Sequence, residues 1–302
     1  MKCIMRVVGV AKEDCAPFLQ ICLDKIKLHL GVAAKNPAFP KFNHFMFETI
    51  AVMIRNVCTL SYFFFFFLLT HTHTYIYNNT GTHRRETVTH FQNSLFPAFQ
   101  QILALQITEF MPYVFQIMAQ LLHPEPNGIT VPFRKMFQML LHPAQYELKG
   151  NVPALVELLK AYMGKPGTGP ESTLAVVVPH LQAVLGVWQK LCCSKATEMH
   201  ALNMLEVIVN SVPLNAYAPM LGQIMGILIQ RLLKVKGMRF KYLFIPTFLF
   251  MIGKIGSAPV ITSVEGLKNG MFATLLSQVL LPNVAKIPGT HERKNCLVGL
   301  CS

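Results

Sequence analysis

The stretch that decides the fold is LQAVLGVWQKL at residues 181–191, where large apolar side chains recur every three or four positions. This spacing places them on one face of an α-helix, whereas a half-buried strand alternates apolar and polar residues. No sustained alternation bounded by hairpin turns occurs in the chain. The sequence therefore predicts an all-α protein. The helical spacing is repeated upstream by Leu155, Leu158, Leu159 and Tyr162.

Proline and glycine divide the chain into expected helices of about 12 to 20 residues joined by short connections. Pro179 and Pro219 each stand in the expected first turn of a helix, where the missing N–H costs little. They are separated by about forty residues, the period of HEAT-type repeats, which are antiparallel helix pairs that stack on their neighbours. We therefore predict a HEAT-type helical-repeat solenoid, a right-handed superhelix of antiparallel helix pairs.

Neither end of the sequence has the polar face that caps a solenoid. The chain begins in an apolar helical segment at Met1 and stops at Ser302, shortly after another helical segment. An open repeat at each end is what a piece cut from a longer array would have. We therefore expect an uncapped fragment of a longer repeat protein.

The charge balance bears on the class of partner. Hydrophobic residues make up 52% and charged residues 14% of the chain, against roughly 25% charged in an ordinary soluble domain. The formal net charge of +13 would suit a nucleic acid, but the cations are scattered and no aromatic residues are interleaved with them. We therefore interpret the cation clusters as solvated helix ends and expect no nucleic-acid binding. The densest clusters are Arg84–Arg85 and Lys234, Lys236, Arg239 and Lys241.

Two apolar stretches, 57–69 and 242–253, are shorter than the roughly 20 residues that span a bilayer. Arg55 precedes the first and Pro246 interrupts the second. The start of the chain lacks a signal-peptide pattern, and the eight cysteines show no CxxC spacing. We therefore predict an intracellular protein with reduced thiols. A small membrane-anchored protein is the rival class.

The histidine pair and the glycine-rich loop each resemble a ligand site only superficially. His71 and His73 form an HxH pair with no further ligands nearby, whereas metal sites need three or four. The loop at 164–170 has its lysine before its later glycines, which is the wrong order for a P-loop. We therefore expect no metal and no cofactor, and we interpret 164–170 as a flexible connection between repeats.

The remaining candidates for chemistry also favour structural roles. Cys192 and Cys193 stand near His200, but adjacent helical residues point about 100° apart and no carboxylate is spaced to orient the histidine. Trp188 falls on the apolar helix face and is expected in the core. The sequon at 78–80 matters only in a secreted chain. We expect no catalytic residues and no enzyme.

Several strings resemble one family in order and separation: MKCIMR at 1–6, FNHFMFE at 42–48, EFMPYVFQ at 109–116 and GNVPALV at 150–156. Weaker matches continue to residue 299. The family is the importin-alpha re-exporter family, also called the CAS or exportin-2 family, in the importin-beta superfamily. The chain resembles an internal part of its members.

The segment 57–87 stands outside this resemblance. It contains five consecutive phenylalanines and HTHTYIY at 71–77, which a thymine tract and alternating CA and TA dinucleotides would encode. We predict HEAT-like repeats at 1–56 and at 88–302, separated by this anomalous low-complexity insert. We expect the insert to be disordered and to come from a retained intron or a gene-model error.

The resemblance implies a nuclear transport receptor that binds importin-alpha together with GTP-bound Ran and returns importin-alpha from the nucleus to the cytoplasm. It also implies shuttling between the two compartments and contact with nuclear-pore proteins at the nuclear envelope. GTP hydrolysis would take place on Ran. Because the family's N-terminal repeats are missing, this chain alone is expected to bind Ran weakly or not at all. The contact residues are unknown at this stage, and the alternative is a helical-repeat scaffold for another protein.

Overall fold

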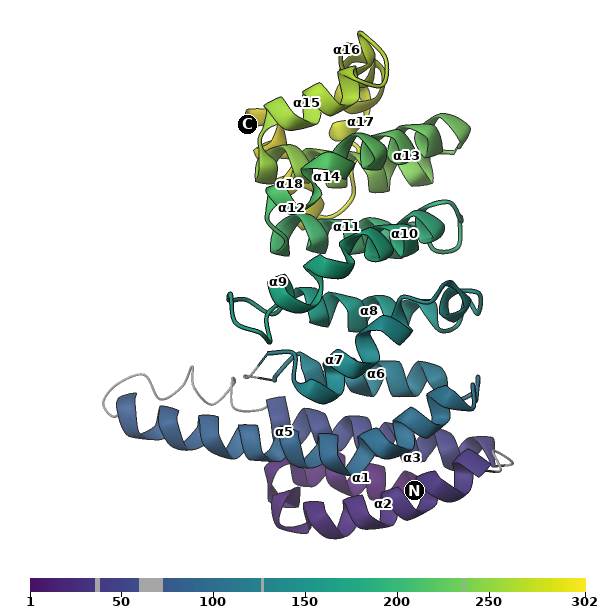
Figure 1. The fold of residues 1–302 in the computed structure, drawn as a ribbon, viewed down its shortest axis with the longest axis vertical. Helices are drawn as coiled ribbons and strands as arrows, with labels where there is room; N and C mark the ends of the chain where they lie inside the picture. Colours follow the sequence, from purple (N-terminus) through teal and green to yellow (C-terminus); the bar gives the residue numbers. More distant parts are fainter. Residues whose placement is uncertain (36–38, 60–72, 126–127, 236) are drawn as a thin grey trace. The chain divides into compact units, whose positions relative to one another are not determined.

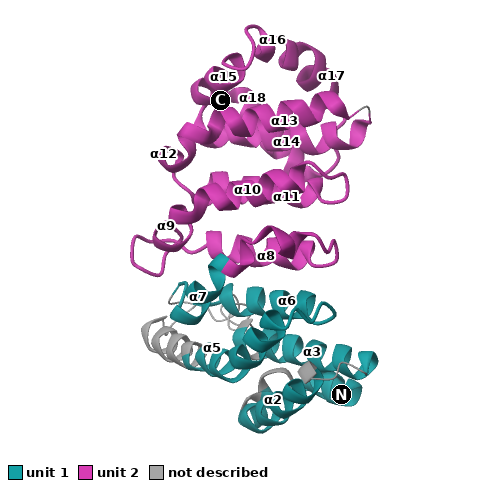
Figure 2. Ribbon diagram, turned by 45° about the vertical axis from the view of Figure 1, so that its right-hand side comes forward, with its two compact units in different colours: residues 1–138 teal, residues 139–302 magenta. Residues whose placement is uncertain are grey.

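A computed structural model describes residues 1–302 except 36–38, 60–72, 126–127 and 236 (Figure 1). Every regular element within these described ranges is a helix. The prediction of an all-α fold is confirmed. The chain divides into two compact units, residues 1–138 and residues 139–302, which are described separately below (Figure 2).

The helices of the first unit form two rows. α1 contacts α3 and α3 contacts α6, whereas α2 packs against α5. Successive helices therefore alternate between rows up to α5, as stacked helix pairs require. The helices are α1 (Lys2–Ala11), α2 (Leu19–Lys35), α3 (Pro40–Ile54), α5 (His73–Ala104), α6 (Met111–Leu122) and α7 (Val131–Leu140), with the short helical turns η1 (Lys12–Phe18) and η2 (Arg55–Thr59).

The second unit repeats the arrangement more regularly. One row is α8, α11, α14 and α18, and the other is α10, α13 and α15, with contacts between neighbours in each row. Helices also pack across the two rows, α10 against α11 and α13 against α14. The longer helices are α8 (Val152–Met163), α10 (Leu181–Cys192), α11 (Glu198–Ser211), α13 (Leu221–Lys234), α14 (Met238–Ile255), α15 (Ser257–Glu265) and α18 (Thr290–Cys301).

Short helical turns join these helices. Pro179 and Pro219 lie in two of them, directly before α10 and α13, so the pair α10 and α11 lies between the two prolines as predicted. The short elements are η3 (Pro143–Tyr146), α9 (Thr173–Val176), η4 (Val178–His180), α12 (Leu214–Tyr217), η5 (Ala218–Met220), α16 (Met271–Leu275), η6 (Leu276–Leu280) and α17 (Leu281–Val284).

The apolar stretch 242–253 lies within α14 and forms part of the core of the second unit. Phe244 and Phe248 are fully buried and stack with their ring centroids 5.2 Å apart. Pro246 is also buried, and α14 continues through it to Ile255. The expectation that Pro246 interrupts this stretch is therefore wrong, because the packed neighbours α11 and α18 hold the helix across the proline.

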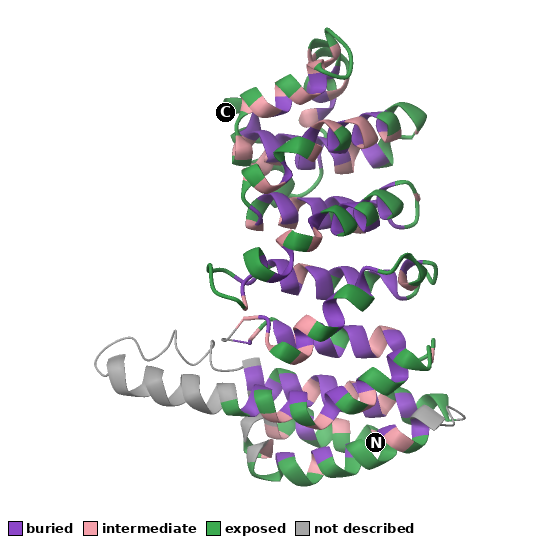
Figure 3. Ribbon diagram, viewed as in Figure 1, coloured by how far each residue is buried: buried purple, intermediate pink, exposed green. Residues whose placement is uncertain are grey.

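A different stretch passes a length and composition test for a membrane span. Thr173–Cys192 is apolar enough, and 44% of its apolar 18-residue segment is buried. In the structure it comprises α9, η4 and α10, with Pro179 inside it. Its buried positions pack against neighbouring helices of the second unit (Figure 3). Buried helices in a protein core are also apolar along much of their length, so this composition is typical of them as well.

α14 and α18 approach each other closely at two glycines. A Cβ atom added to Gly299 would lie 2.8 Å from the Cα atom of Leu249 and against its carbonyl oxygen. One added to Gly253 would lie 3.1 Å from Cγ1 of Val298. The two helices therefore touch backbone to backbone, which only glycine at position 299 permits.

The predicted segment 57–87 falls partly outside the described residues. Residues 55–59 are in η2, and α5 begins at His73, so the backbone of 73–87 is helical. Residues 60–72, which include the five phenylalanines and His71, are not described. The division at 57 and 87, and its origin in a retained intron, stay predictions.

Candidate functional site

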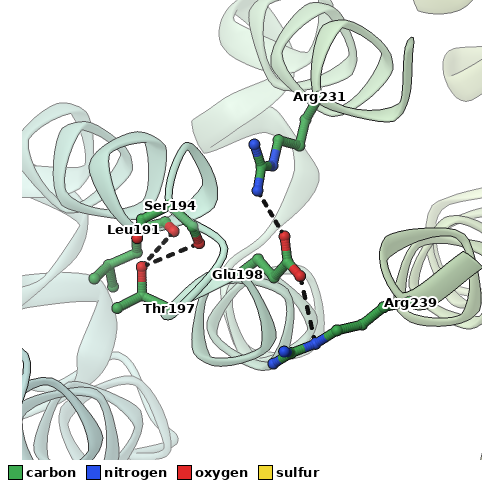
Figure 4. Close-up of polar contacts among 6 residues, drawn as sticks. All are labelled: Leu191, Ser194, Thr197, Glu198, Arg231 and Arg239. Carbon is green, nitrogen blue, oxygen red and sulfur yellow. Dashed lines mark hydrogen bonds and ion pairs between the residues drawn. The ribbon is translucent and has the colours of Figure 1, made fainter. Parts of the chain in front are cut away.

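A buried carboxylate joins two consecutive helix pairs of the second unit (Figure 4). Glu198, the first residue of α11, is 1% exposed. Its Oε2 lies 2.8 Å from Nη2 of Arg231, in the last turn of α13. Its Oε1 lies 3.6 Å from Nε of Arg239, in the first turn of α14. One acidic side chain therefore connects α11 to both helices of the following pair.

The two arginines contribute differently to this cluster. The side chain of Arg231 is 17% exposed and that of Arg239 is 59% exposed. The Arg231 guanidinium carbon also lies 5.7 Å from the ring centroid of Phe240, a cation–π contact. Because burying a carboxylate without a partner is costly, Arg231 is the partner that makes the burial of Glu198 tolerable.

The turn before Glu198 is closed by Thr197. Its hydroxyl donates to the carbonyl oxygen of Leu191 over 2.7 Å, and the carbonyl oxygen of Ser194 lies 3.5 Å away (Figure 4). The Leu191 carbonyl belongs to the last turn of α10, where the C=O groups lack helical partners, and Ser194 follows the end of that helix. Thr197 thus ties the end of α10 to the start of α11 and holds Glu198 in place.

The paired cysteines lie beside this cluster in different environments. Cys192 is fully buried, and burial raises the pKa of its thiol to about 12; Cys193 and Glu198 raise it further, whereas the nearby Arg231 lowers it. Cys193 is exposed. The interpretation of a buried thiol is confirmed for Cys192, which remains protonated at neutral pH and so is not a nucleophile.

We expect the free energy of unfolding to fall as pH rises above about 9. Burial raises the pKa of Cys192 to about 12, that of Tyr217 to about 12 and that of Cys296 to about 11. The unfolded chain therefore loses these protons at a lower pH than the folded protein does. The stability that depends on these three protonated groups is fully present below their unfolded pKa values and is lost as the pH rises above them. Urea unfolding followed by the fluorescence of Trp188, the single tryptophan, measures this. A profile unchanged up to about pH 10.5 would contradict it.

The loop at 164–170 is tied at both ends. The Lys165 N–H donates to Oγ1 of Thr173 over 3.1 Å, and the Thr173 N–H donates to the Lys165 carbonyl over 2.9 Å. Ser172 donates to the carbonyl of Gly169 over 2.7 Å. The Lys165 N–H is thus used within the loop. The flexibility of residues 164–170 stays a prediction, and Ser172 and Thr173 supply local hydrogen bonds at the ends of the loop.

The other candidates divide between the core and the undescribed residues. Trp188 is fully buried, which confirms the prediction of a core residue. His71 lies outside the described residues, and the sequon at 78–80 falls within the first part of α5, residues 73–85, of which only the backbone is described. No group of three His, Cys, Asp or Glu side chains that could hold a metal occurs in the part of the chain that the structure describes.

Nearly the whole chain matches a known protein family. The family profile described as "CAS/CSE protein, C-terminus" matches residues 1–65 and residues 61–302. The chain belongs to this CAS/CSE family. The two matches meet inside the segment 57–87. The strings at 1–6, 42–48, 109–116 and 150–156 all lie within them, so the recognition of the family from these strings is confirmed.

Curated relatives in this CAS/CSE family carry the name exportin-2. The proteins from Danio rerio and Homo sapiens are each 32% identical to this chain, over 300 and 304 residues. The Xenopus laevis protein is 30% identical over 300 residues. Each alignment covers 99% of this chain but 28% of the relative. The chain therefore spans little more than a quarter of the length of these relatives.

A solved CAS/CSE structure has the same architecture. The exportin Cse1 in its cargo-free, cytoplasmic state aligns with a TM-score of 0.79 and 28% identity, over 98% of this chain and 28% of the Cse1 chain. This likeness and the alternating helix rows confirm the prediction of a helical-repeat fold.

Sequence reasoning missed the Glu198 cluster in this CAS/CSE chain. The charge pattern places Arg239 with neighbouring lysines at a solvated helix end, and no motif in the sequence indicates Arg231 or Glu198. The available signal was an acidic residue in the first turn of a helix inside an otherwise apolar repeat. Its partner Arg231 is 33 positions away, too distant for any local pattern to indicate the pair.

Proposed function

We propose that this chain is the part of a nuclear transport receptor that helps to bind importin-alpha together with Ran-GTP, so that importin-alpha returns from the nucleus to the cytoplasm. The observation that carries the proposal is the family match, which extends along nearly the whole chain. The helical-repeat fold shared with the exportin Cse1 supports it.

The physical basis of the proposed activity is a stack of helix pairs that offers many small contacts to protein partners. Small changes at each repeat interface can sum to a larger change of shape. Two partners then bind cooperatively when each stabilises the same shape. In this proposal the receptor is not an enzyme, shuttles between nucleus and cytoplasm, and meets nuclear-pore proteins during transit.

The chain matches only part of each relative, so a test of the proposal must supply the remaining repeats. Because the chain spans 28% of their length, we expect it alone to bind Ran-GTP weakly or not at all. A chimera supplies the remaining repeats: the matching region of Danio rerio exportin-2 is replaced by residues 1–302 of this chain. The parent exportin-2 and a version with that region deleted serve as controls.

We expect immobilised importin-alpha to retain the chimera when Ran is locked in its GTP form and to release it when Ran carries GDP. The deleted version should not be retained in either state. A folded, monomeric chimera that fails to bind under both conditions, while the parent binds with Ran-GTP, would contradict the proposed function. The fold would then belong to a helical-repeat scaffold for another protein partner.

A further inference from the structure

Three successive turns of the second unit lie along one edge of the helix stack. Lys190, near the end of α10, donates to the carbonyl of Pro143 over 2.9 Å and lies 3.7 Å from Glu147, which places the turn before α8 beside the turn after α10. Glu198 and Arg231 place the turn after α10 beside the turn after α13. The three turns lie on the same side of the stack in Figure 1.

Each of these turns exposes a cation and a large aliphatic side chain. Leu148 is 46% exposed, Met199 is 43% exposed and Leu233 is 72% exposed. An exposed lysine lies within four residues of each of them along the chain. We call this set the cationic edge. It consists of Leu148, Lys149, Lys195, Met199, Leu233 and Lys234.

The carboxylates at these turns are already engaged. Glu147 is paired with Lys190, and Glu198 is paired with Arg231 and Arg239. Among the described residues, Lys149, Lys195 and Lys234 have no ion pair with a carboxylate. The cationic edge therefore keeps a net positive charge that a partner of opposite charge would neutralise.

We propose that the cationic edge binds an acidic segment of another protein, in which carboxylates alternate with aliphatic side chains. Helices packed in a row lie about 8 to 10 Å apart, and a chain in the polyproline II conformation rises about 3.1 Å per residue with three residues per turn, so that every third side chain lies on the same face. A carboxylate at every third residue would thus meet a lysine at each turn, and a segment of about nine residues would cross all three. This inference does not depend on the proposed transport function.

The side chains favour an acidic polypeptide over the other anionic partners. Single-stranded nucleic acids bind through aromatic platforms on which bases stack, whereas Leu148, Met199 and Leu233 are aliphatic. Anionic membranes are bound by a continuous amphipathic helix with aromatic or leucine-rich faces. Here the apolar side chains are single residues on separate turns, each suited to one side chain of an extended peptide.

The test uses the full 302-residue chain and a fluorescein-labelled peptide of about twelve residues that repeats Leu-Glu-Ser. Fluorescence anisotropy should show binding that weakens with added salt. Lys234→Glu should weaken the affinity by at least about fivefold, since it replaces attraction by repulsion. Lys254→Glu is the matched control, because Lys254 is also an exposed lysine in a last helical turn but lies at the opposite end of the α13–α14 pair.

A second pair of variants tests the apolar contact. Leu233→Ser should weaken peptide binding by about threefold or more, whereas Leu297→Ser, at a position that is 66% exposed on α18, should not. The peptide with glutamine in place of glutamate should bind poorly. Equal affinities for Lys234→Glu and Lys254→Glu would overturn the proposal. So would preferential binding of oligothymidine or of phosphatidylserine vesicles over the acidic peptide.

Discussion

Glu198→Ala is expected to lower the free energy of unfolding of the second unit by about 3 kcal/mol, because removing one partner of a buried ion pair leaves the other uncompensated. Glu198 is 1% exposed, and Arg231, its partner at 2.8 Å, is 17% exposed. Without the carboxylate, the Arg231 guanidinium would stay between α11 and α13 without an anion. The loss should be spread over two helix pairs, since Glu198 contacts α13 and α14.

Urea unfolding followed by Trp188 fluorescence measures this change, since Trp188 lies in the adjacent α10. Glu157→Ala is the control: the side chain of Glu157 is 53% exposed and pairs with Lys160 at 2.8 Å one helical turn away. Loss of such a surface pair should change stability by no more than about 0.5 kcal/mol. Equal effects of the two substitutions would show that Glu198 contributes no more than a surface charge.

The helix pairs could be predicted because their signals are local. Residues 181–191 carry the helical spacing within one segment, and Pro179 and Pro219 mark where α10 and α13 begin. Such patterns depend only on side-chain direction along a helix and on the missing N–H of proline. The family strings are local as well, so recognition needed no knowledge of tertiary contacts.

The features that could not be predicted depend on contacts between distant segments. Glu198 meets Arg231 across 33 positions and Glu206 accepts a hydrogen bond from Thr247 across 41, and no periodicity relates the members of either pair. The continuity of α14 through Pro246 has the same cause, because burial against α11 and α18 outweighs the local preference of proline to end a helix.

Gly299→Ala is expected to destabilise the packing of α18 on α14 by about 2 to 3 kcal/mol, as overpacking in a closely packed interface does. The new methyl group would lie 2.8 Å from the Cα atom of Leu249. The obstructing atoms belong to the backbone of α14, so they cannot rotate away as a side chain could. Relief requires α18 to move outward, which would expose Cys296, now 1% exposed.

The same substitution at Gly186 is expected to have the opposite effect on stability. Gly186 lies inside α10, and an added Cβ would meet no atom within 4 Å. Alanine there should raise the free energy of unfolding by about 0.5 to 1 kcal/mol, because it restricts the unfolded chain and favours the helix. Hydrogen exchange of the α14 and α18 amides, together with thiol labelling of Cys296, distinguishes the two variants. Faster labelling in Gly299→Ala alone is the expected result. Equal labelling in both would show that α14 and α18 do not approach backbone to backbone.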